Sequence, residues 1–151
     1  MKMQNKLFLY FLLCLLMSSL TNAQSIDVQN LLGKKTNEVI KKYGTPVHKD
    51  DSNPSMICMF YKNKTTNMIF VSGESGVYQA EATKIFDTES EARSNIDEFI
   101  SGSIANGFSV DTLSISDFRL NKTGAKVDLQ LSENKINKNF EIKVKANKTE
   151  S

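Results

Sequence analysis

The sequence predicts an α+β fold of two helix-then-three-strand units, with both helices packed on one face of an antiparallel sheet that is continuous or split. Two segments carry apolar residues at helical spacing, and each precedes three segments with strand patterns. At 40% hydrophobic and 24% charged, the 151 residues have the composition of a globular protein. We expect residues 24–151 to form a single small α+β domain, and two tandem half-modules, 24–86 and 87–147, are the alternative organisation.

The first helical unit begins with Asp27–Leu32, which predicts one or two helical turns. A helix is then expected over Asn37–Tyr43, because Thr36 is a good N-cap and Gly44 a good terminator. A polar loop, Val47–Ser55, separates this helix from the strands. The three expected strands are Met56–Tyr61, Asn67–Ser72 and Val77–Phe86.

The second unit begins with a capping box, in which Thr88 caps the amide of Glu91 and the Glu91 side chain reaches back. Apolar residues at offsets of 0, 4, 7, 8 and 12 from Ala92 share one face of the helix that follows, which Asn106-Gly107 ends. Clean alternation then predicts strands with one buried and one wet face. These strands are Leu113–Leu120, with a bulge near Asp117, Val127–Leu131 and Phe140–Val144.

Residues 1–23 predict a secretory signal peptide that is removed. Lys2 and Lys6 precede the apolar run Leu7–Met17, which is too short for a bilayer core of roughly 30 Å at about 1.5 Å per residue. Small residues then predict cleavage between Ala23 and Gln24, and an uncleaved anchor is the alternative. We expect an exported protein, periplasmic or secreted, with no transmembrane span in the mature chain.

The mature chain has no charge surplus and a single cysteine. The whole chain has 19 basic and 17 acidic residues, so loss of Lys2 and Lys6 leaves 17 of each. This balance argues against a nucleic-acid partner. Cys14 lies within the signal, and the apolar neighbours of Cys58 predict a buried, inert thiol. A reactive thiol or a dimer link is the alternative for Cys58.

The segment Leu32–Pro46 resembles the start of the SmpA/OmlA (BamE-type) outer-membrane assembly proteins. The matching positions are Gly33, Thr36, Glu38-Val39, Gly44 and Pro46. Further similar segments are Phe60-Tyr61, Met68–Val71 and Ser75–Tyr78, so the resemblance covers about residues 31–81. The doubled order is similar to the tandem modules of the β-lactamase-inhibitor-protein (BLIP) fold. The resemblance implies either an assembly role or an inhibitor role.

Catalytic chemistry has few candidates in this sequence. His48 is the only histidine, so a Ser–His–acid or Cys–His site must use it. One histidine and one mature cysteine are too few for a zinc site of three or four such ligands. We expect no catalytic, cofactor or metal site and a protein that is not an enzyme. A small hydrolase or metal-dependent enzyme using His48 is the alternative.

The function that these observations favour is an exported, non-enzymatic binding or assembly module of the bacterial cell envelope that contacts another protein. Two surfaces are candidates for that contact: the wet face of the sheet, and the loop that carries His48, Asp50, Asp51 and Asn53. Thr112, in the triplet Asp111-Thr112-Leu113, is a candidate for O-glycosylation. The sequence does not predict the oligomeric state.

Overall fold

A computed structural model describes residues 26–150 of the chain. The helices are a short 3-10 helix η1 (Val28–Leu31), α2 (Thr36–Tyr43) and α3 (Glu89–Ala105). The strands are β1 (His48–Asp50), β2 (Ile57–Lys62), β3 (Thr66–Gly73), β4 (Gly76–Phe86), β5 (Ser109–Thr112), β6 (Asp117–Lys122), β7 (Ala125–Asn134) and β8 (Asn139–Lys148).

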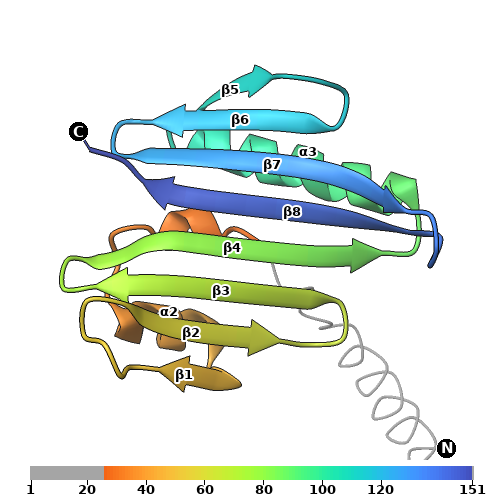
Figure 1. The fold of residues 1–151 in the computed structure, drawn as a ribbon. Coiled ribbons are helices and arrows are strands. Elements are labelled where there is room, and N and C mark those ends of the chain that lie inside the picture. The colour runs from red at the N-terminus through yellow and green to blue at the C-terminus, as the bar shows by residue number, and fades with distance from the viewer. Residues whose placement is uncertain (1–25, 151) are drawn as a thin grey trace, which may run out of the picture.

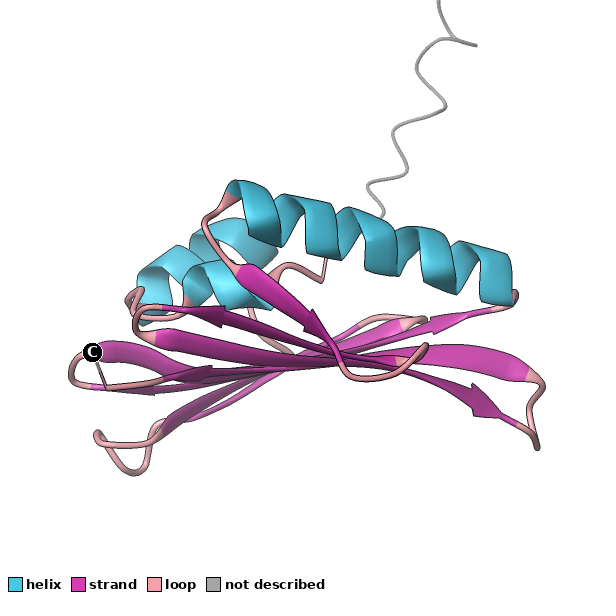
Figure 2. Ribbon diagram, turned by 90° about the horizontal axis from the view of Figure 1, so that it is seen from above, coloured by secondary structure: helices cyan, strands magenta, loops and turns pink. Residues whose placement is uncertain are grey.

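The eight strands described form one antiparallel sheet in the order β1-β2-β3-β4-β8-β7-β6-β5. Its two halves each run outward from the central pair, β4 and β8 (Figure 1). The helices lie on one face of the sheet and leave the other face without a covering element among the residues described (Figure 2). The expected pair of helix-then-three-strand units is therefore wrong, because four strands precede α3, four follow it, and all eight form a single sheet.

Two local features account for the extra strands. Residues His48–Asp50, expected in a polar loop, pair with β2 as an exposed edge strand. The expected long strand from Leu113 is interrupted, because the Leu113 and Ser114 amides both donate to the Asp117 carbonyl and close a turn. The chain on either side of this turn forms β5 and β6, which pair with each other. Neither feature leaves an apolar alternation that the sequence could reveal.

The helix boundaries follow their caps. Thr88 is confirmed as the N-cap of α3, because its Oγ1 accepts from the Glu91 amide at 3.3 Å. The Glu91 carboxylate reaches back to the Thr88 hydroxyl, which donates to it at 3.0 Å. Thr36, expected as the N-cap of α2, is instead its first helical residue. The cap is Lys35, whose backbone is extended and whose side chain makes no capping hydrogen bond.

The core lies between the helices and the sheet. Phe70 and Met59 are fully buried under α2, where the rings of Tyr43, Tyr61 and Phe70 pack with centroids 5.5 to 5.9 Å apart. Val28 of η1 is also fully buried, so the short N-terminal helix belongs to the same core. The core residues of β4 and of β6 to β8 complete it, chiefly Ala80, Ala82, Leu120, Val127, Leu129, Ile142 and Val144.

Candidate functional site

The candidate site is the face of the sheet opposite the helices, which we call the open face. Cross-strand partners share a face, so residues that alternate with the core residues lie here. One row of register partners crosses the whole open face: His48, Phe60, Ile69, Glu81, Lys145, Asp128, Arg119 and Asp111. This row is apolar at its β2 and β3 positions and alternates in charge from β4 onward.

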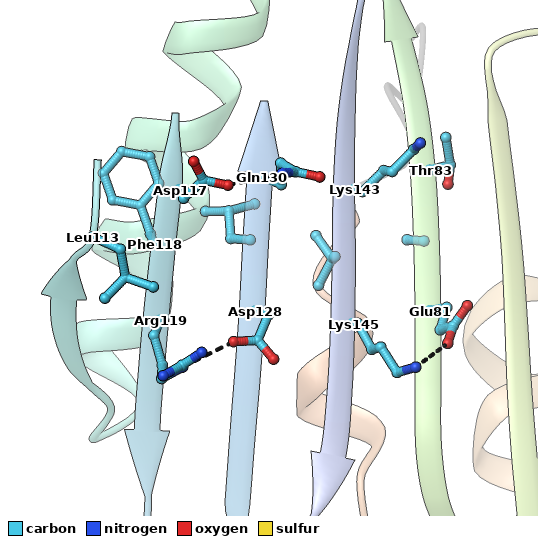
Figure 3. Close-up of a pocket in the computed structure, with 13 residues that line it drawn as sticks. Glu81, Thr83, Leu113, Asp117, Phe118, Arg119, Asp128, Gln130, Lys143 and Lys145 are labelled. Atoms are coloured by element: carbon cyan, nitrogen blue, oxygen red, sulfur yellow. Dashed lines mark hydrogen bonds and ion pairs between the residues drawn. The ribbon is translucent and has the colours of Figure 1, made fainter. Parts of the chain in front are cut away.

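The charged half of the open face comprises Glu81, Asp117, Arg119, Asp128, Lys143 and Lys145. Arg119 Nε lies 3.0 Å from Asp128 Oδ1, and Lys145 Nζ lies 3.3 Å from Glu81 Oε1 (Figure 3). Lys126 adds a looser pair with Asp128 at 3.8 Å. These side chains are 37 to 56% exposed, so each pair contributes only about 0–1 kcal/mol. The charges of this half therefore neutralise one another within the protein.

Asp117 occupies the end of a shallow cavity of about 430 Å³ in the charged half. The carboxylate accepts from Ser114 Oγ at 2.6 Å and from Gln130 Nε2 at 2.8 Å. These hydrogen bonds, first that from Ser114 and then that from Gln130, lower the pKa of Asp117 below its ordinary value. Leu113, from the loop between β5 and β6, contributes an apolar side chain to the lining (Figure 3).

The apolar half of the open face comprises Cys58, Phe60, Ile69 and Val71, all half-buried. They belong to two adjacent strands, because Cys58 pairs with Val71 and Phe60 with Ile69. The centroid of the His48 ring lies 5.6 Å from that of the Phe60 ring, so His48 extends this surface to the edge strand. A water-exposed face of an antiparallel sheet ordinarily carries polar residues. A cluster of apolar side chains there is typical of a contact surface.

The loop expected to mediate interaction is divided by the structure. His48 and Asp50 lie on β1, at register positions opposite Phe60 and Cys58 on the open face. Asp51 and Asn53 lie in the loop that follows and make local contacts: Lys49 Nζ is 2.8 Å from Asp51, and Asn53 Oδ1 accepts from the Ser55 amide at 3.0 Å. Only the strand portion of the predicted loop thus joins the candidate site.

The acidic residues of β1 and its loop have lowered pKa values with local causes. The Ser52 hydroxyl and amide hold the pKa of Asp50 below its ordinary value. The ion pair with Lys49 does the same for Asp51. No three His, Cys, Asp or Glu side chains among residues 26–150 are grouped so that they share a metal position.

Three other predicted positions have separate outcomes. Cys58 is half-buried on the open face and not in the core, so the prediction of a buried thiol is wrong. Thr112 is exposed at the end of the edge strand β5, and its modification stays a prediction. Ala23 and Gln24, the expected cleavage position, lie outside the described residues. No helix within residues 26–150 has the length and hydrophobicity needed to cross a membrane.

Sequence reasoning identified the polar residues of the open face and missed its apolar half. Glu141, Lys143, Lys145, Asp128 and Gln130 lie there as their alternation indicates. The apolar half was missed because the apolar residues of β2 and β3 lie on both sides of the sheet, so no alternation separates the core residues from those of the open face. The signal that could have found it is this loss of alternation in a sheet with helices on only one side.

Comparison with known proteins assigns no family to the chain. No family model matches it, and no curated protein matches it. Two solved structures are similar at 12% identity. An extracellular protein containing an SCP domain from Bacillus anthracis strain Ames has a TM-score of 0.46 over 83% of this chain and 46% of its own length. A cysteine-rich secretory protein from Staphylococcus aureus Mu50 has a TM-score of 0.43 over 76% of this chain and 44% of its own.

The chain thus spans less than half the length of these two structures. The resemblance to the SmpA/OmlA and BLIP proteins is wrong, because no family model matches the chain and its strands form one eight-stranded sheet. The capped short helix, the Gly turn and the aromatic strand that suggested it are elements of local structure, which unrelated folds share.

Proposed function

We propose that this chain is an exported, non-enzymatic binding module that contacts another protein through the open face of its sheet. The expected partner presents an apolar surface to Phe60 and Ile69, bordered by polar groups that meet the charged half. Export is supported by the pattern of residues 1–23, with its basic start and short apolar run.

The observation that carries the proposal is the apolar half of the open face. Phe60, Ile69 and Val71 remain partly exposed on a sheet whose other face already holds a complete core. Burial of apolar area on binding contributes about 25 cal/mol per Å², so this cluster is where association gains most. The charged half offers little net attraction, because its charges are already paired, and serves as a polar border.

A small enzyme that uses His48 finds no comparable support. His48 is exposed on an edge strand, its ring packs against Phe60, and it interacts electrostatically with Asp50 two residues along the strand. A general base needs a positioned partner within about 3 Å, and the Asp50 carboxylate is hydrogen-bonded to the Ser52 amide and hydroxyl. We therefore place His48 at the border of the contact surface.

The test uses residues 24–151 as bait in an envelope extract, with captured proteins identified by mass spectrometry. The Phe60→Ser, Ile69→Thr double variant should lose the captured partner, and Gln130→Ala on the charged half should retain it. Circular dichroism and urea unfolding establish that each variant is folded. Equal capture by the wild type and the folded double variant would overturn the proposal, as would loss of a measured catalytic activity in His48→Ala.

A further inference from the structure

A second candidate site lies on the opposite side of the molecule, between η1 and α3. Two adjoining cavities of about 420 and 580 Å³ share three lining residues, Gln29, Asn30 and Asn106. Asn95 adds a fourth carboxamide to the first cavity. We call this surface the amide groove, and it shares no residue with the open face.

Each of the four carboxamide nitrogens donates one hydrogen bond within the protein. Gln29 Nε2 donates to Ser103 Oγ at 3.0 Å, and Asn30 Nδ2 donates to Asp27 at 3.3 Å. The amide nitrogens of Asn95 and Asn106 donate to backbone carbonyls of α3 at 3.3 and 2.9 Å. Asn95 Oδ1 already accepts from Lys84 Nζ at 3.4 Å, so the acceptors that the groove offers are the carboxamide oxygens of Gln29, Asn30 and Asn106.

Gln29 is the most constrained of these residues. It is 4% exposed, and its Oε1 atom is buried without a hydrogen-bond partner among the described residues. An unsatisfied buried acceptor costs about 1–3 kcal/mol, so a ligand that donates to it gains a strong interaction. Gln29 lines both cavities, so its side chain lies where the two cavities adjoin.

Charge distinguishes the two ends of the groove. In the first cavity the two acidic residues each face a lysine: Asp27 lies 2.6 Å from Lys42, and Glu98 interacts electrostatically with Lys84. No surplus negative charge is left to attract a cation, so neutral donors such as hydroxyl groups fit this end. The second cavity is lined by three lysines and no acidic residue: Lys34, Lys122 and Lys148.

We propose that the amide groove binds a saccharide that carries an acidic group. Its hydroxyl groups donate to the carboxamide oxygens of Asn30, Asn106 and Gln29. Its carboxylate lies toward Lys34 and Lys148 in the second cavity, since Lys122 already donates to the Asn106 carbonyl at 2.8 Å. A typical ligand pocket has a volume of about 300–1,000 Å³, so each cavity admits a sugar ring.

The experiment titrates ¹⁵N-labelled protein, residues 24–151, with glucose, glucuronate and acetate at matched ionic strength. The side-chain amide resonances of Gln29, Asn30 and Asn106 report binding directly. Glucuronate should shift them with an affinity about three- to tenfold higher than that of glucose, because one exposed charge-assisted contact is added. Acetate should leave them in place.

Variants separate a ligand site from a purely structural role. Gln29→Met keeps the length of the side chain and removes the acceptor, so glucuronate binding should weaken at least about fivefold. Asn30→Ala, a half-buried position, repeats the test if Gln29→Met does not fold. Lys148→Ala should remove the preference for glucuronate over glucose. Asn121→Ala, on the open face, is the matched control and should change nothing.

Several outcomes would overturn the inference. In the wild type, these are no shift with either sugar at 100 mM, equal binding of glucose and glucuronate, or equal shifts with acetate and glucuronate. In the variants, the outcome is a shift that persists in folded Gln29→Met and Asn30→Ala. None of these outcomes bears on the open face, so failure here leaves the proposed function unaffected.

Discussion

The two halves of the open face use the same sheet and the same register in opposite ways. In the charged half, Arg119 faces Asp128 and Lys145 faces Glu81 across neighbouring strands, so water and the protein together satisfy every one of these charges. In the apolar half, Phe60 faces Ile69 and neither is fully covered. The difference shows that the fold needs only one face of this sheet, and that the composition of the other face is free to serve recognition.

The largest expected effect comes from substitutions that test whether stability depends only on the face of the sheet that the helices cover. Phe70 is fully buried, whereas its neighbour Ile69 lies on the open face. Phe70→Ala should lower the free energy of unfolding by about 3–5 kcal/mol, and Ile69→Ala by less than about 1.5 kcal/mol. Urea unfolding followed by circular dichroism measures both. Equal losses would mean that the open face is a second core.

A second change converts the apolar half into a charged one. Phe60→Lys should leave the free energy of unfolding within about 1 kcal/mol of the wild type, because the ring is only half-buried. It should reduce binding of a hydrophobic fluorescent dye several-fold, because the apolar cluster is broken. Arg119→Lys, which preserves the charged half, serves as the control and should bind as much dye as the wild type.

A double-mutant cycle on Arg119→Met and Asp128→Asn measures the charged half. The coupling energy should be about 0.2–1 kcal/mol and should shrink when salt is raised, because both side chains are more than a third exposed. Urea unfolding of the wild type, the two single variants and the double variant provides this coupling energy. A coupling above about 2 kcal/mol would show that this half contributes to stability as a core does.

The smallest effect concerns Asp117. Its pKa is lowered in the folded protein, so its contribution to stability is present above the ordinary carboxyl pKa and is lost as pH falls through the lowered value, below about pH 4. Ser114→Ala should raise the pKa of Asp117 toward its ordinary value, and Gln130→Leu should raise it less. Carboxyl ¹³C chemical shifts recorded against pH measure the three midpoints, and an unchanged midpoint in Ser114→Ala would contradict the assignment.

Local signals predicted what local interactions determine. The capping box of Thr88 and Glu91 and the alternation after Val127 correspond to α3 and β7 because each depends on residues a few positions apart. β1 and β5 were not predictable as strands, since each is only three or four residues long and exists through pairing with its neighbour. The exposure of Phe60 was not predictable, because no local pattern records which face of a sheet the helices cover.

The amide groove illustrates the same limit at longer range. Gln29 and Ser103 are 74 positions apart, and each is an ordinary polar residue in the sequence. Their hydrogen bond, and the acceptor it leaves on Gln29, exist only once η1 packs beside α3. A site built from single amides on separate elements therefore leaves no motif, in contrast to the charged half, whose alternation is visible strand by strand.

The strand order has a consequence for the timing of folding. β4 and β8 are central neighbours, yet residues 87–138 separate them in the chain, so the middle of the sheet closes only when β8 is available. Contacts between distant segments slow folding, because the entropy of the intervening loop is lost before those contacts can stabilise the chain. During synthesis from the N-terminus, the edge of β4 stays unpaired until β8 has been made. For a protein proposed to be exported, this delay favours a chain that is still incompletely folded while it crosses a membrane.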